Sequence, residues 1–229
     1  MAMQLEAVVP FGRSLDEYCQ MFALTPEALT GNILGVADGP ASFNAELTAQ
    51  GGQVTSVDPL YAFTPDDIQQ RFDAVIDNII EQVRQTPDDW VWSYHRSPDD
   101  LRANRLRVLA AFLADYSRGD SRYVVGELPT LAFASGQFDL ALCSHFLFLY
   151  TDHFTYEFHL AAMLEMLRVA REVRVFPLLT LGLARSPYLP TIQTVLTAQG
   201  YTVRMMQVPY ELQRGGNEML VVTRNSPED

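Results

Sequence analysis

Residues 33–47, ILGVADGPASFNAEL, decide the fold class because they combine a short apolar run, a turn and a helix start. The apolar run predicts a buried strand at residues 33–37, and Pro40 in a first helical position predicts a helix over residues 40–50. Gly39 lies in the turn, where the lack of a side chain lets the backbone approach a ligand closely. Free amides at a helix start favour an anionic group. Such a turn is where an α/β protein binds a nucleotide-like cofactor.

Strand and helix patterns alternate along most of the chain. Further strands are predicted at residues 53–58, 122–127, 137–143, 172–181, 201–210 and 218–224, and further helices at residues 153–169 and 187–199. Apolar strands that alternate with helices indicate a parallel sheet covered on both faces. The last two strands have no helix between them and should pair antiparallel at one edge. We therefore expect an α/β, Rossmann-like, doubly wound sheet of seven strands, mostly parallel with an antiparallel terminal strand, in a single domain over residues 1–229.

Helix start signals replace strand signals between the second and third predicted strands. A hydroxyl residue, a proline and two acids occur in this order at Thr64, Thr86 and Ser97. The hydroxyl can cap a helix, proline suits its first position, and the acids face the positive end of the helix dipole. The sequence therefore predicts a helical insertion at about residues 61–119. Nearer the N-terminus, Ser14 begins a helix with capping-box spacing.

The charge of the chain argues against a nucleic-acid partner. The formal net charge is −12, whereas binding to a phosphate backbone needs a basic surface. The nearest approach to a basic patch is formed by Arg96, Arg102, Arg105 and Arg107. These arginines lie on one predicted helix and are interpreted as its solvated face.

Other features of the composition exclude several enzyme classes and locations. The chain has no lysine, which excludes Schiff-base enzymes, pyridoxal-phosphate enzymes and P-loop nucleotidases. No run approaches 18 apolar residues, and the N-terminus lacks a secretory pattern. Cys19 and Cys143 are far apart in apolar contexts and are interpreted as reduced thiols. We expect a cytoplasmic protein without a membrane span or a metal site.

Polar residues follow four of the predicted strands, at the edge of the sheet where ligands bind. Asp38 follows the first strand, Asp58 the second, Glu127 the third, and Ser144 with His145 the fourth. A carboxylate after the second strand can accept both hydroxyls of a ribose. Three of these residues also have an explanation without a ligand, in which Asp58 caps a turn, Glu127 is solvated and His145 is a hydrogen-bonded core residue. Because all four strand ends share one edge, they together predict a nucleoside-shaped site.

The segment YVVGELPTLAFASGQFDLALCSHFLFLY, residues 123–150, resembles the third-to-fourth-strand region of class I S-adenosylmethionine-dependent methyltransferases. The order of elements, including the terminal antiparallel pair, is also similar. The resemblance covers about residues 30–60 and 120–224 and leaves the helical insertion outside it. Within the class, the chain is most similar to a group of bacterial proteins without an assigned substrate.

The resemblance implies a site for the methionine and ribose parts of S-adenosyl-L-methionine. Ala37, Asp38 and Gly39 would line the methionine moiety, and Asp58 would hold the ribose. The chain departs from the family pattern at Gly35, where an acid usually anchors the methionine amino group. Alanines also stand for two glycines of the turn, and no glycine pair precedes the fifth strand. We consider Asp38 as a replacement for the missing carboxylate.

The same resemblance implies contacts for the rest of the cofactor. Pro59 and Leu60 would lie beside the adenine. Glu127 would accept from its amino group, and the Leu128 amide would donate to a ring nitrogen. Ser144 would lie near the sulfonium end.

The leading hypothesis is methyl transfer to a small-molecule acceptor. The reaction is a direct displacement, so positioning supplies much of its rate. His145 and Tyr150 are the candidate catalytic residues, and Trp92, His153 and Tyr210 are candidate acceptor contacts. The helical insertion would cover the site as a lid, although an ordinary helical hairpin with core aromatic residues fits the sequence equally well.

Two alternatives remain open from the sequence. An NAD-dependent oxidoreductase would share Asp58, but the turn lacks Gly-x-Gly-x-x-Gly spacing and the terminal strand pair is atypical of that fold. A methyltransferase-like domain that has lost catalysis and binds a partner would explain the departures at Gly35 and at the two alanines. The sequence leaves the oligomeric state and the acceptor open.

Overall fold

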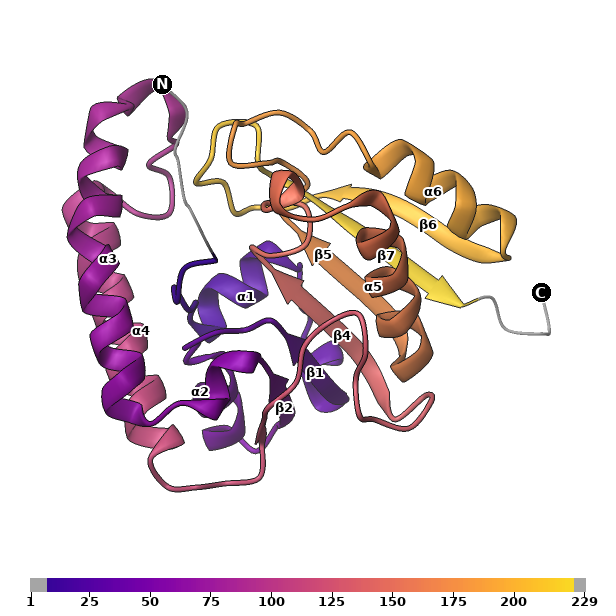
Figure 1. Ribbon diagram of the computed structural model, residues 1–229, viewed down its shortest axis with the longest axis horizontal. Coiled ribbons are helices and arrows are strands. Elements are labelled where there is room, and N and C mark those ends of the chain that lie inside the picture. Colours follow the sequence, from indigo (N-terminus) through magenta and orange to yellow (C-terminus); the bar gives the residue numbers. More distant parts are fainter. Residues whose placement is uncertain (1–7, 225–229) are drawn as a thin grey trace.

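The structure of the protein is a computed structural model that describes residues 8–224. Its centre is a seven-stranded sheet in the order β3-β2-β1-β4-β5-β7-β6 (Figure 1). The strands are β1 Asn32–Val36, β2 Gln53–Val57, β3 Tyr123–Val124, β4 Phe138–Ser144, β5 Ala170–Phe176, β6 Tyr201–Gln207 and β7 Glu218–Arg224. Neighbours from β3 to β5 are parallel, whereas β7 is antiparallel to both β5 and β6. The predicted sheet is confirmed, and its strand order is that of the class I methyltransferase fold.

Helices cover both faces of the sheet. They are α1 Leu15–Met21, α2 Phe43–Ala49, α3 Pro65–Gln85, α4 Pro98–Tyr116, α5 Tyr156–Val169 and α6 Leu189–Ala198, with short 3₁₀ turns at Ala28–Thr30, Pro59–Ala62, Pro87–Asp89 and Thr151–His153. The apolar residues of β1 alternate between two cores, so that Ile33 packs with α1 and α2, and Leu34 packs with α5 and α6. This alternation explains why the strand reads as a continuous apolar run.

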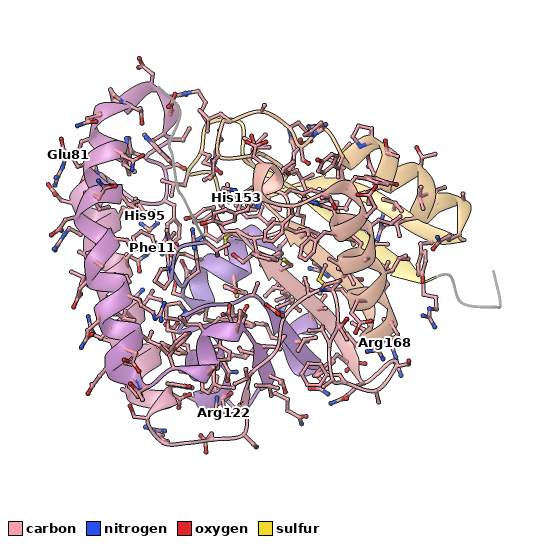
Figure 2. The ribbon with its side chains drawn as sticks, viewed as in Figure 1. Phe11, Glu81, His95, Arg122, His153 and Arg168 are labelled. Atoms are coloured by element: carbon pink, nitrogen blue, oxygen red, sulfur yellow. The ribbon has the colours of Figure 1, made fainter. Side chains whose placement is uncertain are left out.

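The segment after β2 contains the long helices α3 and α4, which lie side by side beyond the β2 end of the sheet (Figure 1). Figure 2 shows Glu81 on the outer side of this helix pair and His95 on the side that faces the sheet. Thr64 caps α3 by accepting from the Asp67 amide, and Ser97 caps α4 by accepting from the Asp100 amide. These two predicted helix starts are confirmed.

The third predicted helix start, at Thr86, is confirmed only in part, because Thr86 is the N-cap residue of a 3₁₀ turn but its side chain does not cap that turn. Thr86 is the C-cap of α3, and only the short 3₁₀ turn Pro87–Asp89 follows it. The Thr86 hydroxyl donates to the Gln82 carbonyl and accepts from the indole of Trp90 at 3.0 Å. Because both contacts tie the hydroxyl to other groups, it does not cap the amides of the following turn.

Several predicted boundaries also need correction. The helix expected at residues 40–50 begins at Phe43, because the Pro40 carbonyl belongs to a turn packed against Gly12, where a Cβ would lie 2.0 Å from it. The third strand is only Tyr123–Val124, and it pairs with just two residues of β2. The strand expected at residues 172–181 ends at Phe176, before a proline that has no amide to donate.

Candidate functional site

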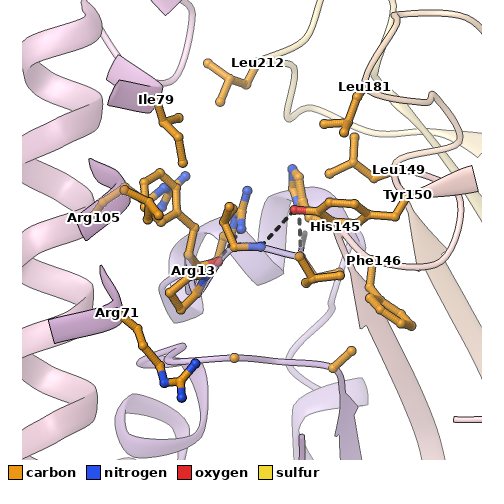
Figure 3. A pocket seen from close by; sticks show the side chains of 18 of the residues that line it. Arg13, Arg71, Ile79, Arg105, His145, Phe146, Leu149, Tyr150, Leu181 and Leu212 are labelled. Carbon is orange, nitrogen blue, oxygen red and sulfur yellow. Dashed lines mark hydrogen bonds between the residues drawn. The ribbon is translucent and has the colours of Figure 1, made fainter. Parts of the chain in front are cut away.

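A cavity of about 1090 Å³ lies between α3 and the carboxyl ends of β1, β2 and β4 (Figure 3). Ligand pockets usually measure about 300–1,000 Å³, so this cavity has room for a cofactor and a second small molecule. Most of the predicted site residues line it, namely Ala37, Asp38, Gly39, Asp58, Pro59, Leu60, Ser144, His145 and Tyr150. Three of the four predicted strand ends therefore meet in one place, and the fourth, which carries Glu127, lies outside the lining.

Asp58 links the turns after β1 and β2 through hydrogen bonds to one backbone amide in each. Its Oδ2 accepts from the Gly39 amide at 2.8 Å, and its Oδ1 accepts from the Leu60 amide at 2.7 Å. Burial raises the pKa of Asp58 to about 6, although both amide hydrogen bonds favour the ionised form. Each carboxylate oxygen has a second lone pair, so the group can still accept from a ligand hydroxyl.

Asp38 occupies the space that a side chain at Gly35 would need. A Cβ at Gly35 would lie 1.8 Å from Oδ2 of Asp38, which leaves room only for glycine. Tyr18 donates to Asp38 Oδ1 at 2.6 Å and Ser56 donates to Oδ2 at 2.7 Å. Burial, reinforced by the nearby charge of Asp58, raises the pKa of Asp38 to about 7 despite these two hydrogen bonds. The absence of an acid at position 35 is thus coupled to a buried acid three residues later.

Three residues on the cavity wall have left-handed backbone conformations. The φ angles are 54° at Ala37, 56° at Gly39 and 50° at His145. Gly39 adopts this region freely, but a residue with a Cβ pays about 1 kcal/mol for it. Ala37 therefore keeps the backbone conformation of a glycine, although it is not one. Strained backbone of this kind concentrates at functional sites.

His145 is half-buried at the end of β4. Its amide donates to the Phe176 carbonyl at 2.6 Å, and its Nδ1 lies 2.9 Å from the Ser144 hydroxyl. Burial and the charges of Arg13 and Arg105 hold the pKa of His145 well below its usual value. The imidazole is therefore neutral near pH 7, and in the part of the chain that the structure describes its Nε2 has no hydrogen-bond partner. A neutral imidazole can accept a proton.

Tyr150 lies beside His145 in the cavity wall (Figure 3). Its side chain is 2% exposed, and its hydroxyl accepts from the Val9 amide at 3.2 Å. Burial raises the pKa of Tyr150 above its usual value. The phenol is therefore protonated at neutral pH and can donate a hydrogen bond towards a ligand.

Five predicted site residues lie outside the lining of the cavity, and the roles proposed for them stay predictions. Glu127 is exposed, and Leu128 is buried under the turn that follows β3. Trp92 packs at the margin of the core, whereas the neighbouring Trp90 lines the cavity. The other two are His153, which is exposed beside Tyr150, and Tyr210, which is fully buried.

A buried ionic network that the sequence does not predict lies in the wall of the cavity, which Arg105 lines. Glu17 of α1 and Arg105 of α4 are 0% and 1% exposed and form a bidentate pair, with N–O distances of 2.7 and 2.9 Å. Glu17 Oε1 also accepts from Tyr210 at 3.2 Å and lies 3.3 Å from His95 Nε2. The expectation that Arg105 belongs to a solvated face is wrong. Arg102 and Arg107 of the same helix are half-buried and exposed, whereas the Arg105 guanidinium is buried in its pair with Glu17 of α1.

The raised pKa of Asp38 predicts a pH dependence of stability. Between pH 4 and pH 7 the folded state holds a proton on this carboxyl that the unfolded state has lost, so the free energy of unfolding falls as pH rises. The wild-type protein should therefore lose about 2 kcal/mol relative to Asp38→Asn between pH 5 and pH 8. Urea unfolding of both proteins at the two pH values measures the difference. Parallel changes in the two proteins would contradict the prediction.

Residues 8–224 show neither a metal site nor a membrane-spanning helix. No group of three or more histidine, cysteine, aspartate or glutamate side chains is arranged to hold a metal ion there. None of the helices in this range is long and apolar enough to cross a membrane.

Comparison with known proteins gives one relative over the whole chain. No family model matches. The chain is 31% identical over 223 residues to the uncharacterized protein MJ0045 of Methanocaldococcus jannaschii, a match that covers 97% of this chain and 99% of that protein.

Several solved structures are similar at low identity. The magnesium protoporphyrin IX methyltransferase of Synechocystis PCC 6803 with bound SAM matches with a TM-score of 0.47 and 15% identity, over 92% of this chain and 78% of that one. A TehB-like SAM-dependent methyltransferase of Corynebacterium glutamicum matches with a TM-score of 0.48 and 14% identity, over 92% and 87%. The methyltransferase domain of bacterial CtHen1 matches with a TM-score of 0.48 and 15% identity, over 93% and 100%. A likeness at this level says nothing about substrates or site residues.

Proposed function

The chain belongs to the family of the M. jannaschii protein MJ0045, and we propose that this family member transfers a methyl group from S-adenosyl-L-methionine to a small-molecule acceptor in the cytoplasm. One observation carries the proposal. Two buried carboxylates, Asp38 and Asp58, stand at the ends of β1 and β2 on the wall of the same cavity. The class I methyltransferase fold places the cofactor at this edge of the sheet. The net charge of −12 favours a small acceptor over a nucleic acid.

The residues present fit the cofactor. Asp58 has lone pairs left for the two ribose hydroxyls, and its hydrogen bonds to Gly39 and Leu60 hold both turns beside it. Asp38 is a buried carboxyl that no cation among residues 8–224 pairs with, so a positively charged amino group would favour its ionised form and offset the cost of burial. Asp38 therefore takes the part of the acid that the family pattern expects at position 35.

The cofactor, when bound, supplies an electrophilic methyl group on its sulfonium. The chain's own contribution is to bind, orient and exclude water. Ser144 and His145 stand at the end of β4, between the two carboxylates and the apolar part of the cavity. When the methyl acceptor carries a proton on its attacking atom, the neutral His145 imidazole takes up that proton. The helix pair α3 and α4 closes the other side of the cavity and acts as the lid.

Calorimetric titration with S-adenosylmethionine, S-adenosylhomocysteine and NAD tests the proposed function. We expect the first two to bind with dissociation constants on the order of micromolar and NAD not to bind. In Asp58→Ala this binding should disappear, because the variant loses the ribose acceptor and loosens both turns. Asp73→Ala removes the same charge from an exposed position of α3 and should bind like the wild type. Binding of NAD alone would indicate an oxidoreductase, and binding of neither would leave a non-enzymatic domain.

His145→Ala should separate catalysis from cofactor binding. The variant lacks the proton acceptor but keeps both carboxylates, so the dissociation constant of S-adenosylhomocysteine should stay within about threefold of the wild type. Transfer of the labelled methyl group to a low-molecular-mass metabolite fraction should fall by about a hundredfold. Unchanged transfer would remove His145 as the base.

A further inference from the structure

Part of the cavity is lined by apolar side chains that have no role in the proposed cofactor site. We call them the apolar collar, which consists of Ile79, Val83, Trp90, Leu149, Leu181 and Leu212. Figure 3 shows Ile79, Leu181 and Leu212 in the upper part of the view, whereas Arg71 lies in the lower part. The collar thus surrounds a region of the cavity that differs in character from the region of the two carboxylates.

Hydrogen bonds join the segments that carry the collar. The Val91 amide donates to the Leu212 carbonyl at 2.8 Å, which ties the segment after α3 to the connection between β6 and β7. The Leu181 amide donates to the Leu149 carbonyl at 3.1 Å, which ties the loop after β5 to the loop after β4. The indole of Trp90 donates to the hydroxyl of the α3 C-cap residue at 3.0 Å. This last contact satisfies the one polar side-chain atom of the collar.

Three collar residues lie outside the two cores that flank the sheet. Ile79 is 5% exposed, Leu149 is 8% exposed and Leu181 is half-buried, yet none of them belongs to either core. Their side chains line the cavity instead. Since burial of apolar surface is favourable, a wall of this kind favours a ligand with an apolar body.

His145 offers a proton-accepting nitrogen to the cavity. The Ser144 hydroxyl donates to the Met21 sulfur at 3.9 Å, since a thioether has no proton to give. The Ser144 oxygen then accepts from Nδ1 of His145, which lies 2.9 Å away. This arrangement favours the tautomer with its proton on Nδ1. The lone pair is then on Nε2, which has no hydrogen-bond partner among residues 8–224.

The imidazole of His145 is a weak base. Burial and the charges of Arg13 and Arg105 hold the pKa of His145 well below its usual value. A weak base takes up the proton of an aromatic hydroxyl group more readily than that of an alkyl hydroxyl group, because the aromatic group is the more acidic. The phenol of tyrosine, for example, has a pKa of about 10. The same two charges disfavour an ammonium group beside the imidazole.

We propose that the apolar collar is the acceptor subsite and that the acceptor is an uncharged aromatic hydroxyl compound. Its ring packs inside the collar, and its hydroxyl group donates to Nε2 of His145. The hydroxyl oxygen forms a bond to the methyl carbon, the carbon–sulfur bond breaks with its electron pair left on sulfur, and the proton passes to Nε2. The products are a methyl aryl ether and S-adenosylhomocysteine. The inference rests on the proposed function, which supplies the methyl group.

Titration with aromatic probes tests the chemical class of the acceptor. Phenol, 2-naphthol and 4-phenylphenol are each titrated into the protein with saturating S-adenosylhomocysteine, and at least one should bind with a dissociation constant below about 1 mM. For the best binder, the arene without the hydroxyl group should bind about tenfold more weakly, because it cannot donate to His145. The analogue with a carboxylate in place of the hydroxyl group should also bind about tenfold more weakly, since the collar offers its charge no partner. With S-adenosylmethionine, mass spectrometry should detect the methyl ether of the best binder.

Variants of His145 and of one collar residue link the probe to the subsite. His145→Ala should remove the preference for the hydroxyl compound over the arene. Ile79→Asn should weaken the hydroxyl compound by about tenfold, whereas the apolar control Ile79→Val should change its affinity by less than about threefold. All three variants should bind S-adenosylhomocysteine within about threefold of the wild type. Thermal unfolding shows whether each variant is folded, and Leu181→Asn replaces Ile79→Asn if that variant is not.

The outcomes separate this inference from the proposed function. If S-adenosylhomocysteine binds but no aromatic hydroxyl compound depends on His145 and the collar, the inference is wrong and the proposed function stands. Tighter binding of the carboxylate, or binding of the hydroxyl compound without formation of its ether, would also contradict the inference. If S-adenosylhomocysteine does not bind, the proposed function fails, and a probe whose binding to the free protein depends on His145 and Ile79 would support the subsite alone.

Discussion

Asp38→Asn should bind S-adenosylhomocysteine about a hundredfold more weakly than the wild-type protein. The carboxylate is buried, and in the proposed complex it faces the cofactor's positively charged amino group. The amide keeps the shape and can still bond to Tyr18 and Ser56, but it cannot neutralise the cation. Calorimetric titration at pH 8, where the wild-type carboxyl is ionised, measures the loss.

A reciprocal substitution is the sharpest control for this prediction. Gly35→Asp alone should destabilise the protein, since its Cβ would lie 1.8 Å from Asp38 Oδ2. Gly35→Asp combined with Asp38→Gly removes the collision and returns a carboxylate to the same space, so it should recover most of the affinity. Wild-type affinity in Asp38→Asn would show that the cofactor's amino group is held elsewhere.

Glu17→Gln should lower the free energy of unfolding by about 3–5 kcal/mol. Glu17 is fully buried and is the carboxylate that Arg105, His95 and Tyr210 share. Although burial opposes it, the charge of Arg105 holds the pKa of Glu17 well below its usual value. The amide would leave the Arg105 guanidinium buried and uncompensated. Urea unfolding at pH 7 measures the change.

Two further variants show whether the cost comes from an unbalanced charge. Replacing both partners, in Glu17→Leu with Arg105→Met, should cost much less than Glu17→Gln, because no charge is left unpaired. Asp100→Asn breaks the exposed pair with Arg96 and should change the free energy of unfolding far less than Glu17→Gln does. A loss below about 1 kcal/mol in Glu17→Gln would mean that water reaches Arg105.

The sequence predicts the interior strands well and the edges poorly. The strands at residues 33–37, 53–58 and 137–143 lie within one residue of β1, β2 and β4, because a strand buried on both faces has a continuous apolar pattern. The third strand is shorter than predicted, since it lies at the sheet edge and its exposed residue Val125 carries the same apolar signal as a paired one. Helix starts are ambiguous where a hydroxyl such as Thr86 has a competing partner.

The site is predictable where it follows the strand ends. Asp38, Asp58 and His145 meet because parallel strands end at the same edge. No such rule predicts that Arg13 and Gln213 line the cavity, because they lie in connections whose path over the sheet depends on tertiary packing. Their place in the lining of the cavity is visible only in three dimensions.

The collision between positions 35 and 38 has an evolutionary consequence. An acid gained at position 35 would clash, and an acid lost at position 38 would leave no carboxylate, so neither single substitution leads back to the usual family pattern. The two positions must change together. A glycine in the first strand followed three residues later by aspartate is therefore a sequence signature. Under the proposed function, we expect relatives with this pattern to hold the cofactor's amino group with the later aspartate.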